Sequence, residues 1–404
     1  MTRTRATHHL RRSFSLLCAG LLLAACAPPR PAPPPDPAEA LRGLAATGYQ
    51  PESRNAIVTQ RETWSVGDAL IDTALTLPAG GTGRAPLIIY LPGLGEPADA
   101  GLLWRESWAR AGYAVLALQP VAAGPAIWSG PRARAGDFNR LAQEQFDPAT
   151  LPSRLRVLAR AVDELTRRAQ AGAPFYSAID TGRLALAGYD LGAQTATAAV
   201  AQGGELQGRV RALVLLGTVT PATRAGAEVA PPADLRLPVL SLTGALDHDP
   251  YGFNNLPAQR QGAWQAWPPG DKYLLMLAGG SHALLAGNGV SDPDAPVAFS
   301  RMPGTRGPGA ARGDTGGGEG AGDGGTGSGN RGRNRASRRS REDGPGTTMG
   351  QDDTHTLDLR QIAAVQTLSL AFFDATLKSS PPARAWLAQQ ARLWLDASGT
   401  LSAR

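Results

Sequence analysis

Residues 184–192 read Leu-Ala-Leu-Ala-Gly-Tyr-Asp-Leu-Gly, and the small-residue run Ala-Gln-Thr-Ala-Thr-Ala-Ala-Val follows directly. The apolar start predicts a buried strand, and the alanine-rich continuation predicts a helix. Asp190 lies at the turn between them, with Gly188 two residues before it and Gly192 two residues after it. Glycines at these positions let strand and helix approach closely, so that the turn lifts the central side chain above the edge of a sheet. Asp190 is therefore the first candidate for a reactive side chain.

Short apolar runs rich in valine, isoleucine and leucine recur on both sides of this turn. We expect strands near residues 56–66, 70–77, 86–91, 114–119, 183–189, 211–217, 239–244 and 273–277. Helical patterns lie near residues 98–111, 152–170, 191–202, 357–378 and 384–396. The first two strands are spaced as a hairpin, whereas the others are continuously apolar, which is typical of a parallel sheet covered on both faces. The sequence therefore predicts one α/β domain with a mostly parallel central sheet and helices on both faces.

Two later predicted strands are each followed by a polar residue of catalytic type. The strand near residues 239–244 leads to Asp247, with Asp249 as a neighbouring candidate. The strand near residues 273–277 leads to His282. The carboxyl ends of parallel strands meet at one edge of a sheet, so Asp190, Asp247 and His282 are predicted to form a triad in the chain order nucleophile, acid, histidine.

An oxyanion hole for such a triad needs two backbone N–H groups. One is expected from Leu191, the residue after the candidate nucleophile. The second is expected from the loop that follows the strand near residues 86–91, which reads Pro-Gly-Leu-Gly-Glu over residues 92–96. Leu94 is the candidate in that loop. No cluster with metal-ligand spacing occurs in the sequence, and we expect neither a metal nor another cofactor.

These motifs resemble the α/β-hydrolase superfamily over about residues 59–387, apart from a low-complexity segment. The stretch 188–192 is similar to the elbow of dienelactone hydrolases, which carry cysteine at the middle position. The stretch 92–95, Pro-Gly-Leu-Gly, is similar to the His-Gly-x-Gly of platelet-activating-factor acetylhydrolase-like lipases. The resemblance implies the α/β-hydrolase fold and a hydrolase that acts on a small-molecule substrate.

Two departures from the family pattern affect the chemistry, since Asp190 replaces serine or cysteine and Pro92 replaces histidine. A carboxylate that attacks an ester carbonyl forms an intermediate from which it leaves again, because its pKa of about 3.9 is far below that of an alcohol. A carboxylate works better on an sp³ carbon, where it opens an epoxide or displaces a halide and becomes an alkyl ester.

Three interpretations therefore stay open. The chain is a dienelactone hydrolase-like or lipase-like hydrolase of an ester or lactone, with Asp190 as nucleophile or as general base on water. Alternatively, it is a catalytically inactive hydrolase-fold surface lipoprotein used for binding, although the retained Asp247 and His282 argue against this. In the third interpretation it is an epoxide hydrolase or haloalkane dehalogenase that forms an alkyl-Asp190 intermediate. Such relatives have a helical cap, for which residues 218–237 offer only about twenty positions, and a His-Gly-x-Pro motif that is absent here.

The N-terminus predicts lipid anchoring in a bacterial envelope. Residues 1–25 have the basic start and short apolar run of a signal peptide, and residues 23–26 read Leu-Ala-Ala-Cys, which matches a lipobox with Cys26 as the lipidated residue. Ala27 follows, and the absence of aspartate there implies the outer membrane by resemblance to other lipoproteins. Residues 26–50 form a proline-rich tether.

The rest of the chain divides by composition. Residues 51–288 and 354–404 are expected to build the hydrolase domain, and residues 289–353, rich in glycine and arginine, are expected to be a disordered insertion. The formal net charge is +6, and four arginines within residues 1–25 account for most of it. No basic field remains that would favour nucleic acid. The membrane, through Cys26, and a small-molecule substrate are the expected partners.

Overall fold

The computed structural model describes residues 36–80, 83–201, 204–218, 235–248, 250–251, 257–289 and 351–404. Cys26, the predicted signal peptide 1–25, residues 26–35 of the tether, residues 290–350 of the predicted insertion, Asp249 and most of residues 218–237 lie outside these ranges. The chain divides into residues 1–40 and 41–404. Helix α2 (Pro37–Ala46) begins in the first unit, and the second unit contains the sheet and the remaining helices.

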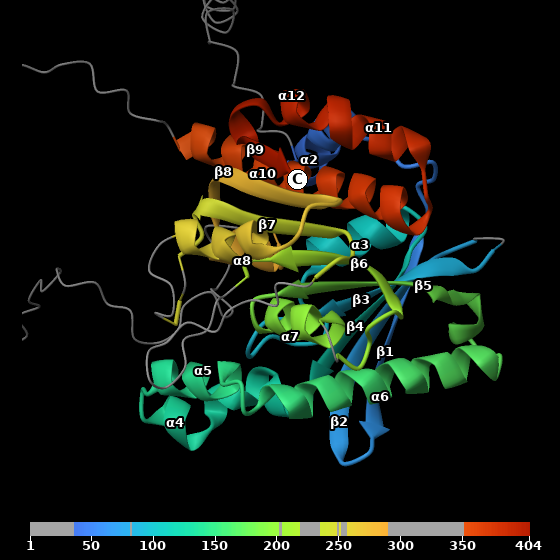
Figure 1. Ribbon diagram of the computed structural model, residues 1–404, viewed down its shortest axis with the longest axis vertical. Helices are drawn as coiled ribbons and strands as arrows, with labels where there is room; N and C mark the ends of the chain where they lie inside the picture. The colour runs from blue at the N-terminus through green and yellow to red at the C-terminus, as the bar shows by residue number, and fades with distance from the viewer. Residues whose placement is uncertain are drawn as a thin grey trace, which may run out of the picture. The chain divides into compact units, whose positions relative to one another are not determined.

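A sheet of nine strands forms the centre of this second unit (Figure 1). The strands are β1 (Ile57–Val66), β2 (Ala69–Pro78), β3 (Ala85–Leu91), β4 (Ala114–Pro120), β5 (Ile179–Tyr189), β6 (Val210–Leu216), β7 (Val239–Leu246), β8 (Lys272–Ser281) and β9 (Gly399–Ala403). Their order is β1-β2-β4-β3-β5-β6-β7-β8-β9. Strands β3 to β8 are parallel, while β2 is antiparallel to β1 and β4, and β9 is antiparallel to β8. This order, with a sharp turn into a helix after β5, is that of the α/β-hydrolase fold.

Helices cover both faces of the sheet, as Figure 1 shows with α10 and α11 on one side and α6 on the other. One face packs against α3 (Leu102–Arg110), α9 (His282–Ala286), α10 (Gln351–Leu377), α11 (Pro381–Gln389) and α12 (Ala391–Leu395). The other packs against α6 (Leu151–Gln170), α7 (Leu191–Val200) and α8 (Gly262–Ala266). Alternate residues of a strand point to opposite faces. Ile88 and Tyr90 of β3 accordingly join the first core, while Leu87 and Ile89 join the second.

Short elements complete the described chain. They are α4 (Pro131–Arg134), α5 (Phe138–Phe146) and the 3-10 turns η1 (Val121–Ala123), η2 (Pro125–Ser129), η3 (Tyr176–Ala178), η4 (Pro257–Gln261) and η5 (Asp396–Ser398). Apolar side chains of α4 and α5 pack against Leu94, Leu191 and Tyr251 at the carboxyl edge of the sheet. This small third core lies over the turn that contains Asp190.

The predicted fold class, an α/β-hydrolase fold with a mostly parallel sheet covered on both faces, is confirmed. The helix expected over residues 98–111 begins only at Leu102, because Gly101 adopts a left-handed conformation (φ 67°) against the Tyr90 ring. The helix expected over residues 384–396 is divided into α11 and α12, and α11 starts earlier, at a Pro381 that follows the capping Ser380. Strand β9, helix α2 and the short helices α4, α5, α8 and α9 were not predicted. Helix α2 lies within residues 26–50, which were expected to be a tether.

Candidate active site

The turn after β5 has the strained geometry that the sequence predicts for a nucleophile elbow. Asp190 has φ 53° and ψ −114°, and its side chain is buried. A Cβ atom on Gly188 would lie 2.5 Å from the carbonyl carbon of Gly192, and one on Gly192 would lie 2.0 Å from the carbonyl oxygen of Leu91. Both contacts are shorter than van der Waals distance and involve backbone atoms. The two glycines therefore allow strand, turn and helix to pass this closely.

Asp247 follows β7 and is fully buried. Its Oδ1 lies 2.7 Å from His282 Nδ1, and its Oδ2 accepts a hydrogen bond of 2.7 Å from Thr243 Oγ1. Arg260 is also buried; its Nε donates to the Asp247 carbonyl oxygen at 2.9 Å and lies 3.4 Å from Oδ1. Burial alone would raise the pKa of Asp247, but His282, Arg260 and Thr243 together lower it. The group is held as a carboxylate.

His282 is the first residue of α9, and its ring stacks obliquely on Tyr189 with 4.9 Å between centroids. Its Nε2 faces Asp190 Oδ1 at 3.7 Å, which is too long for a hydrogen bond. Burial by itself would lower the pKa of His282, but the carboxylates of Asp190 and Asp247 raise it to about 9. At neutral pH the resting site therefore holds an imidazolium between two carboxylates.

The second oxygen of Asp190 is held by two donors. The Leu94 N–H donates to Asp190 Oδ2 at 3.2 Å, and the Tyr251 hydroxyl donates to the same oxygen at 3.1 Å. Oδ1, in contrast, has no hydrogen-bond partner among the described residues. Leu191, the other residue expected in the oxyanion hole, is the first residue of α7, where N–H groups have no intrahelical acceptor. The amide of Leu94 thus binds the candidate nucleophile itself.

The structure therefore brings the three polar residues predicted at strand ends, and Leu94 and Leu191, into one site. Sequence reasoning missed Thr243, Tyr251 and Arg260. Thr243 lies inside a strand that was predicted only from its apolar character. Tyr251 and Arg260 follow β7 without a motif, and only the fold brings them to Asp190 and Asp247.

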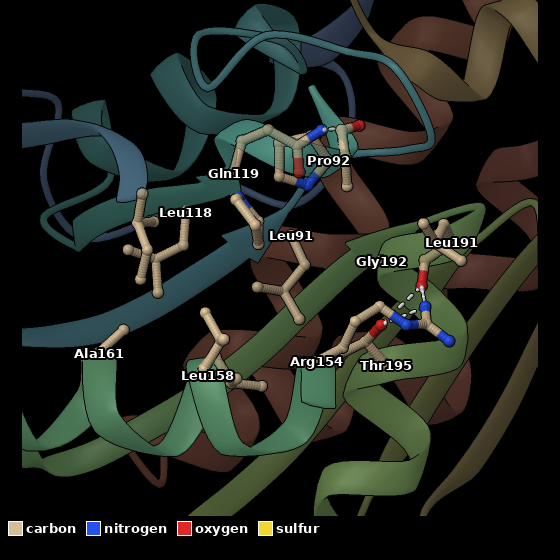
Figure 2. A pocket seen from close by; sticks show the side chains of 14 residues that line it. Leu91, Pro92, Leu118, Gln119, Arg154, Leu158, Ala161, Leu191, Gly192 and Thr195 are labelled. Atoms are coloured by element: carbon tan, nitrogen blue, oxygen red, sulfur yellow. Dashed lines mark hydrogen bonds between the residues drawn. The ribbon is translucent and has the colours of Figure 1, made fainter. Parts of the chain in front are cut away.

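A cavity adjoins the elbow on the α6 side of the sheet (Figure 2). Its walls are mostly apolar, and its lining includes Ile71, Leu91, Pro92, Leu118, Val157, Leu158, Arg154, Leu191, Gly192 and Thr195. Arg154 is the one charged residue in this lining. It donates to Thr195 Oγ1 at 2.9 Å and to Gln194 Oε1 at 2.6 Å. No carboxylate of the described residues lies within ion-pair distance of it. Burial lowers the pKa of Arg154, and the charge of Asp190 offsets part of this decrease. The resulting pKa is about 10.

No helix in the described ranges is both long and apolar enough to cross a membrane. The same ranges contain no group of three histidine, cysteine or acidic side chains placed to hold a metal ion.

Comparison with known proteins finds similarity among solved structures. No model of a known protein family matches the chain, and no curated protein sequence matches it. Among solved structures, the chain is similar to a ferulic acid esterase from Streptomyces cinnamoneus, with 17% identity and a TM-score of 0.48 over 82% of this chain and 93% of the other. The assignment of the α/β-hydrolase fold rests on strand order and the elbow rather than on this similarity.

Proposed function

We propose that this chain is a hydrolase in which the Asp190 carboxylate attacks an electrophilic sp³ carbon and forms an alkyl ester, which water then cleaves. The observation that supports this proposal is that the two Asp190 oxygens differ in their hydrogen bonding. Oδ2 accepts from Leu94 N–H and the Tyr251 hydroxyl, whereas Oδ1 faces His282 without a hydrogen bond to a described residue. A carboxylate held by one oxygen presents the lone pairs of the other for attack.

In the first step, an Asp190 Oδ1 lone pair forms a bond to the substrate carbon, and the bond from that carbon to an epoxide oxygen or a halide breaks. The leaving atom takes the bonding electron pair. A halide leaves as the anion, whereas an epoxide oxygen needs a proton, which His282 Nε2 supplies from the imidazolium form. The elbow positions the nucleophile before the substrate arrives, which lowers the entropic part of the barrier.

In the second step, water attacks the Asp190 carbonyl carbon of the ester. Once Asp190 is esterified its charge is lost, and the pKa of His282 falls because one of the two carboxylates that raise it is gone. His282 is neutral at this point, because it has given its proton to the epoxide oxygen or has lost it after its pKa fell. It then takes a proton from water. Negative charge develops on Oδ2, where the Leu94 N–H and the Tyr251 hydroxyl stabilise it. The alcohol leaves with a proton from His282, and Asp190 is regenerated with one oxygen from water.

The dienelactone hydrolase-like or lipase-like interpretation, with hydrolysis of an ester or lactone, is less well supported. A substrate carbonyl oxygen needs the Leu94 N–H, which already donates to Asp190. That interpretation requires Asp190 to release the amide and act as a general base on water. Trapping of a covalent intermediate separates this interpretation from alkyl-ester chemistry, and turnover separates it from an inactive lipoprotein used for binding.

The lining of the cavity beside the elbow contains neither Asp190 nor His282, so we propose that it holds the part of the substrate that is remote from the reacting carbon. Apolar walls favour an apolar body, and Arg154, as the charged residue of the lining, favours a substrate that carries a carboxylate or another anionic group. The preferred substrate is therefore proposed to be an apolar epoxide or haloalkane with an anionic group.

The test traps the covalent intermediate. His282→Gln protein is incubated with a panel of epoxides, haloalkanes, lactones and activated esters, and its intact mass is measured. The substitution removes the base of the second step, and alkylation by a haloalkane needs no proton from His282, so we expect the haloalkanes of the panel to give an alkyl adduct that peptide mapping locates at Asp190. The matched control is Asp190→Asn, which must show no adduct.

Labelled water separates the alternatives in the wild type. With enzyme in excess over substrate in H₂¹⁸O, the alkyl-ester route puts the label into Asp190 and leaves the first product unlabelled. Label in the first product, without an adduct in His282→Gln, would establish Asp190 as a base. Absence of both turnover and adduct across the panel would favour the inactive lipoprotein.

Lipid anchoring at Cys26 is part of the same proposal, and its support is the lipobox and the preceding apolar run. We propose that the protein is anchored in the outer membrane of a bacterial envelope, with its hydrolase domain on a proline-rich tether. After expression in a Gram-negative host, the mature protein should have a mass that includes acyl chains, and it should be found in the membrane fraction. Both should be lost in Cys26→Ser, and a soluble, unmodified wild type would refute anchoring.

A further inference from the structure

We infer that Glu96 is a positioning residue that keeps the Leu94 N–H directed at Asp190, and that it does so only as a carboxylate. The inference rests on the proposed function and deepens it, because it names a second acidic group on which the reactive Asp190 geometry depends. Glu96 lies two residues after Leu94 in the loop that follows β3, and it does not touch Asp190 itself.

The Glu96 carboxylate closes a chain of hydrogen bonds between two loops. Its Oε2 accepts from the Gly93 N–H at 2.8 Å, and its Oε1 accepts from Asn288 Nδ2 at 2.8 Å. Asn288 Oδ1 in turn accepts from the Gly101 N–H at 2.7 Å. Asn288 follows α9, the helix that begins with His282. The chain thus ties the loop of Leu94 to the segment of the catalytic histidine.

The two peptide units around Gly93 are held by different groups. The unit before it is held by Gly93 N–H donating to Glu96. The unit after it has its carbonyl oxygen bound by Gln119 Nε2 at 3.0 Å and its N–H, that of Leu94, bound to Asp190. Because a peptide unit is planar and trans, fixing both units fixes the direction of the Leu94 N–H. Loss of the Glu96 contact frees one of the two.

The charge state of Glu96 decides whether the chain can form. Gly93 N–H and Asn288 Nδ2–H are both donors, so each needs an acceptor on the carboxyl group. A proton on Oε1 that points toward Asn288 would place two donors face to face, and a proton that points away would leave Oε1 a weaker acceptor. Rotation of the Asn288 amide would remove that clash but would set its NH₂ group against the Gly101 N–H. Protonation therefore breaks or weakens one link in each arrangement.

The surroundings set the pKa of Glu96 within the working range. The titratable groups that face it are Asp190, His282, Tyr90 and Tyr189. Burial raises its pKa most; the hydrogen bonds from Gly93 and Asn288 lower it, Asp190 raises it and His282 lowers it, with a result of about 7. Activity that depends on the carboxylate is then present above about pH 7 and is lost as the pH falls through that value.

The experiment uses the full chain and two matched variants. Glu96→Gln keeps an acceptor for Gly93 N–H but turns its NH₂ group toward the donor of Asn288. The double variant Glu96→Gln with Asn288→Asp restores every link, because the new carboxylate at position 288 accepts from both the new side-chain amide at position 96 and the Gly101 N–H. It also moves the titrating charge to the exposed position 288.

Two readouts are measured for wild type, the single variant and the double variant. The first is the protection of peptides covering residues 92–96 in hydrogen exchange, with each rate divided by its intrinsic rate at the same pH. Wild type should lose protection between pH 8 and pH 6, the single variant should be unprotected at both values, and the double variant should be protected at both. The second readout is the pH profile of kcat/KM. The single variant should lose about tenfold or more at pH 8, and the double variant should recover and lack the acidic limb near pH 7.

The possible results distinguish the positioning role of Glu96 from the proposed chemistry of Asp190. Protection that does not change with pH in wild type, or that persists in Glu96→Gln, overturns the positioning role whatever the activity. A double variant that stays unprotected, with an unchanged melting temperature, overturns it too. The expected protection pattern together with no Asp190 adduct in His282→Gln supports the positioning role and refutes the proposed chemistry.

Discussion

The Leu94 N–H donates to Asp190 Oδ2 at 3.2 Å, although the two residues are 96 positions apart in the chain. In a hydrolase with a serine nucleophile, an amide at this place would serve the oxygen of a substrate. Here the nucleophile carries its own second oxygen, and that oxygen occupies the amide. Replacement of a hydroxyl by a carboxylate therefore moves the site of oxyanion stabilisation from the substrate to Asp190, which supports the alkyl-ester chemistry that we propose.

Tyr251→Phe tests this shift. The Tyr251 hydroxyl is the second donor to Oδ2, and the water step that we propose builds negative charge on that oxygen. Loss of one such donor should slow that step by roughly 10- to 100-fold and hardly affect alkylation. Quenched single-turnover samples should then contain the alkyl adduct that wild type does not accumulate. Tyr273→Phe, on β8 away from the site, is the control, and an equal slowing in both variants would argue against the role of Tyr251.

The elbow glycines should be indispensable for folding. In Gly192→Ala, the new Cβ would lie 2.0 Å from the Leu91 carbonyl oxygen, which is backbone and cannot rotate away. We expect a loss of about 3 kcal/mol or more of the free energy of unfolding, measured by urea denaturation. Gly262→Ala is the matched control, because the added methyl group meets nothing within 4 Å there and lies in a short helix where alanine is favoured. A Gly192→Ala protein as stable as wild type would contradict the close packing at the elbow.

The strained turn and the strand order could be predicted because each has a local signature. Glycines flank Asp190 within five residues, and continuous apolar runs mark the parallel strands. The contacts that shape the site have no such signature. Asn288 and Glu96 are 192 positions apart, and Tyr251 is 61 positions from Asp190. Side chains that meet only through the fold leave no periodicity or spacing in the sequence. The meeting of Asp190, Asp247 and His282 at one edge of the sheet was therefore predictable, while their other hydrogen-bond partners were not.

The raised pKa of His282 predicts a definite pH window. In the unfolded chain the group titrates near 6.5, and in the folded protein its pKa is about 9 because of Asp190 and Asp247. The stabilisation is therefore complete below about pH 6.5 and is lost as the pH rises through about 9. We expect the free energy of unfolding of wild type to fall by roughly 1–3 kcal/mol across this window.

Measurement of this effect needs two variants. His282→Gln should lack the decrease between about pH 6.5 and 9, since it has no titrating ring. Asp190→Asn should retain a smaller decrease, because Asp247 still pairs with Nδ1 at 2.7 Å. Urea titrations at several pH values give the comparison. The same slope in wild type and His282→Gln would show that another group titrates, and His282 would then not be an imidazolium at neutral pH.

Arg154 should determine which substrates are preferred, not whether catalysis occurs. Its guanidinium lies at the α7 end of the cavity, where Figure 2 shows it reaching Leu191 and Thr195. Without a carboxylate partner in the described ranges, its charge is available to an anionic group of the substrate. Arg154→Met keeps much of the side-chain volume and removes the charge, so KM for an anionic epoxide should rise at least about tenfold, while KM for a neutral one of similar size stays nearly constant. Arg156→Met, two residues along the same helix and exposed, is the control. If Arg154→Met raised both KM values equally, its hydrogen bonds to Thr195 and Gln194 would be supporting the elbow helix, and the anionic substrate class would be wrong.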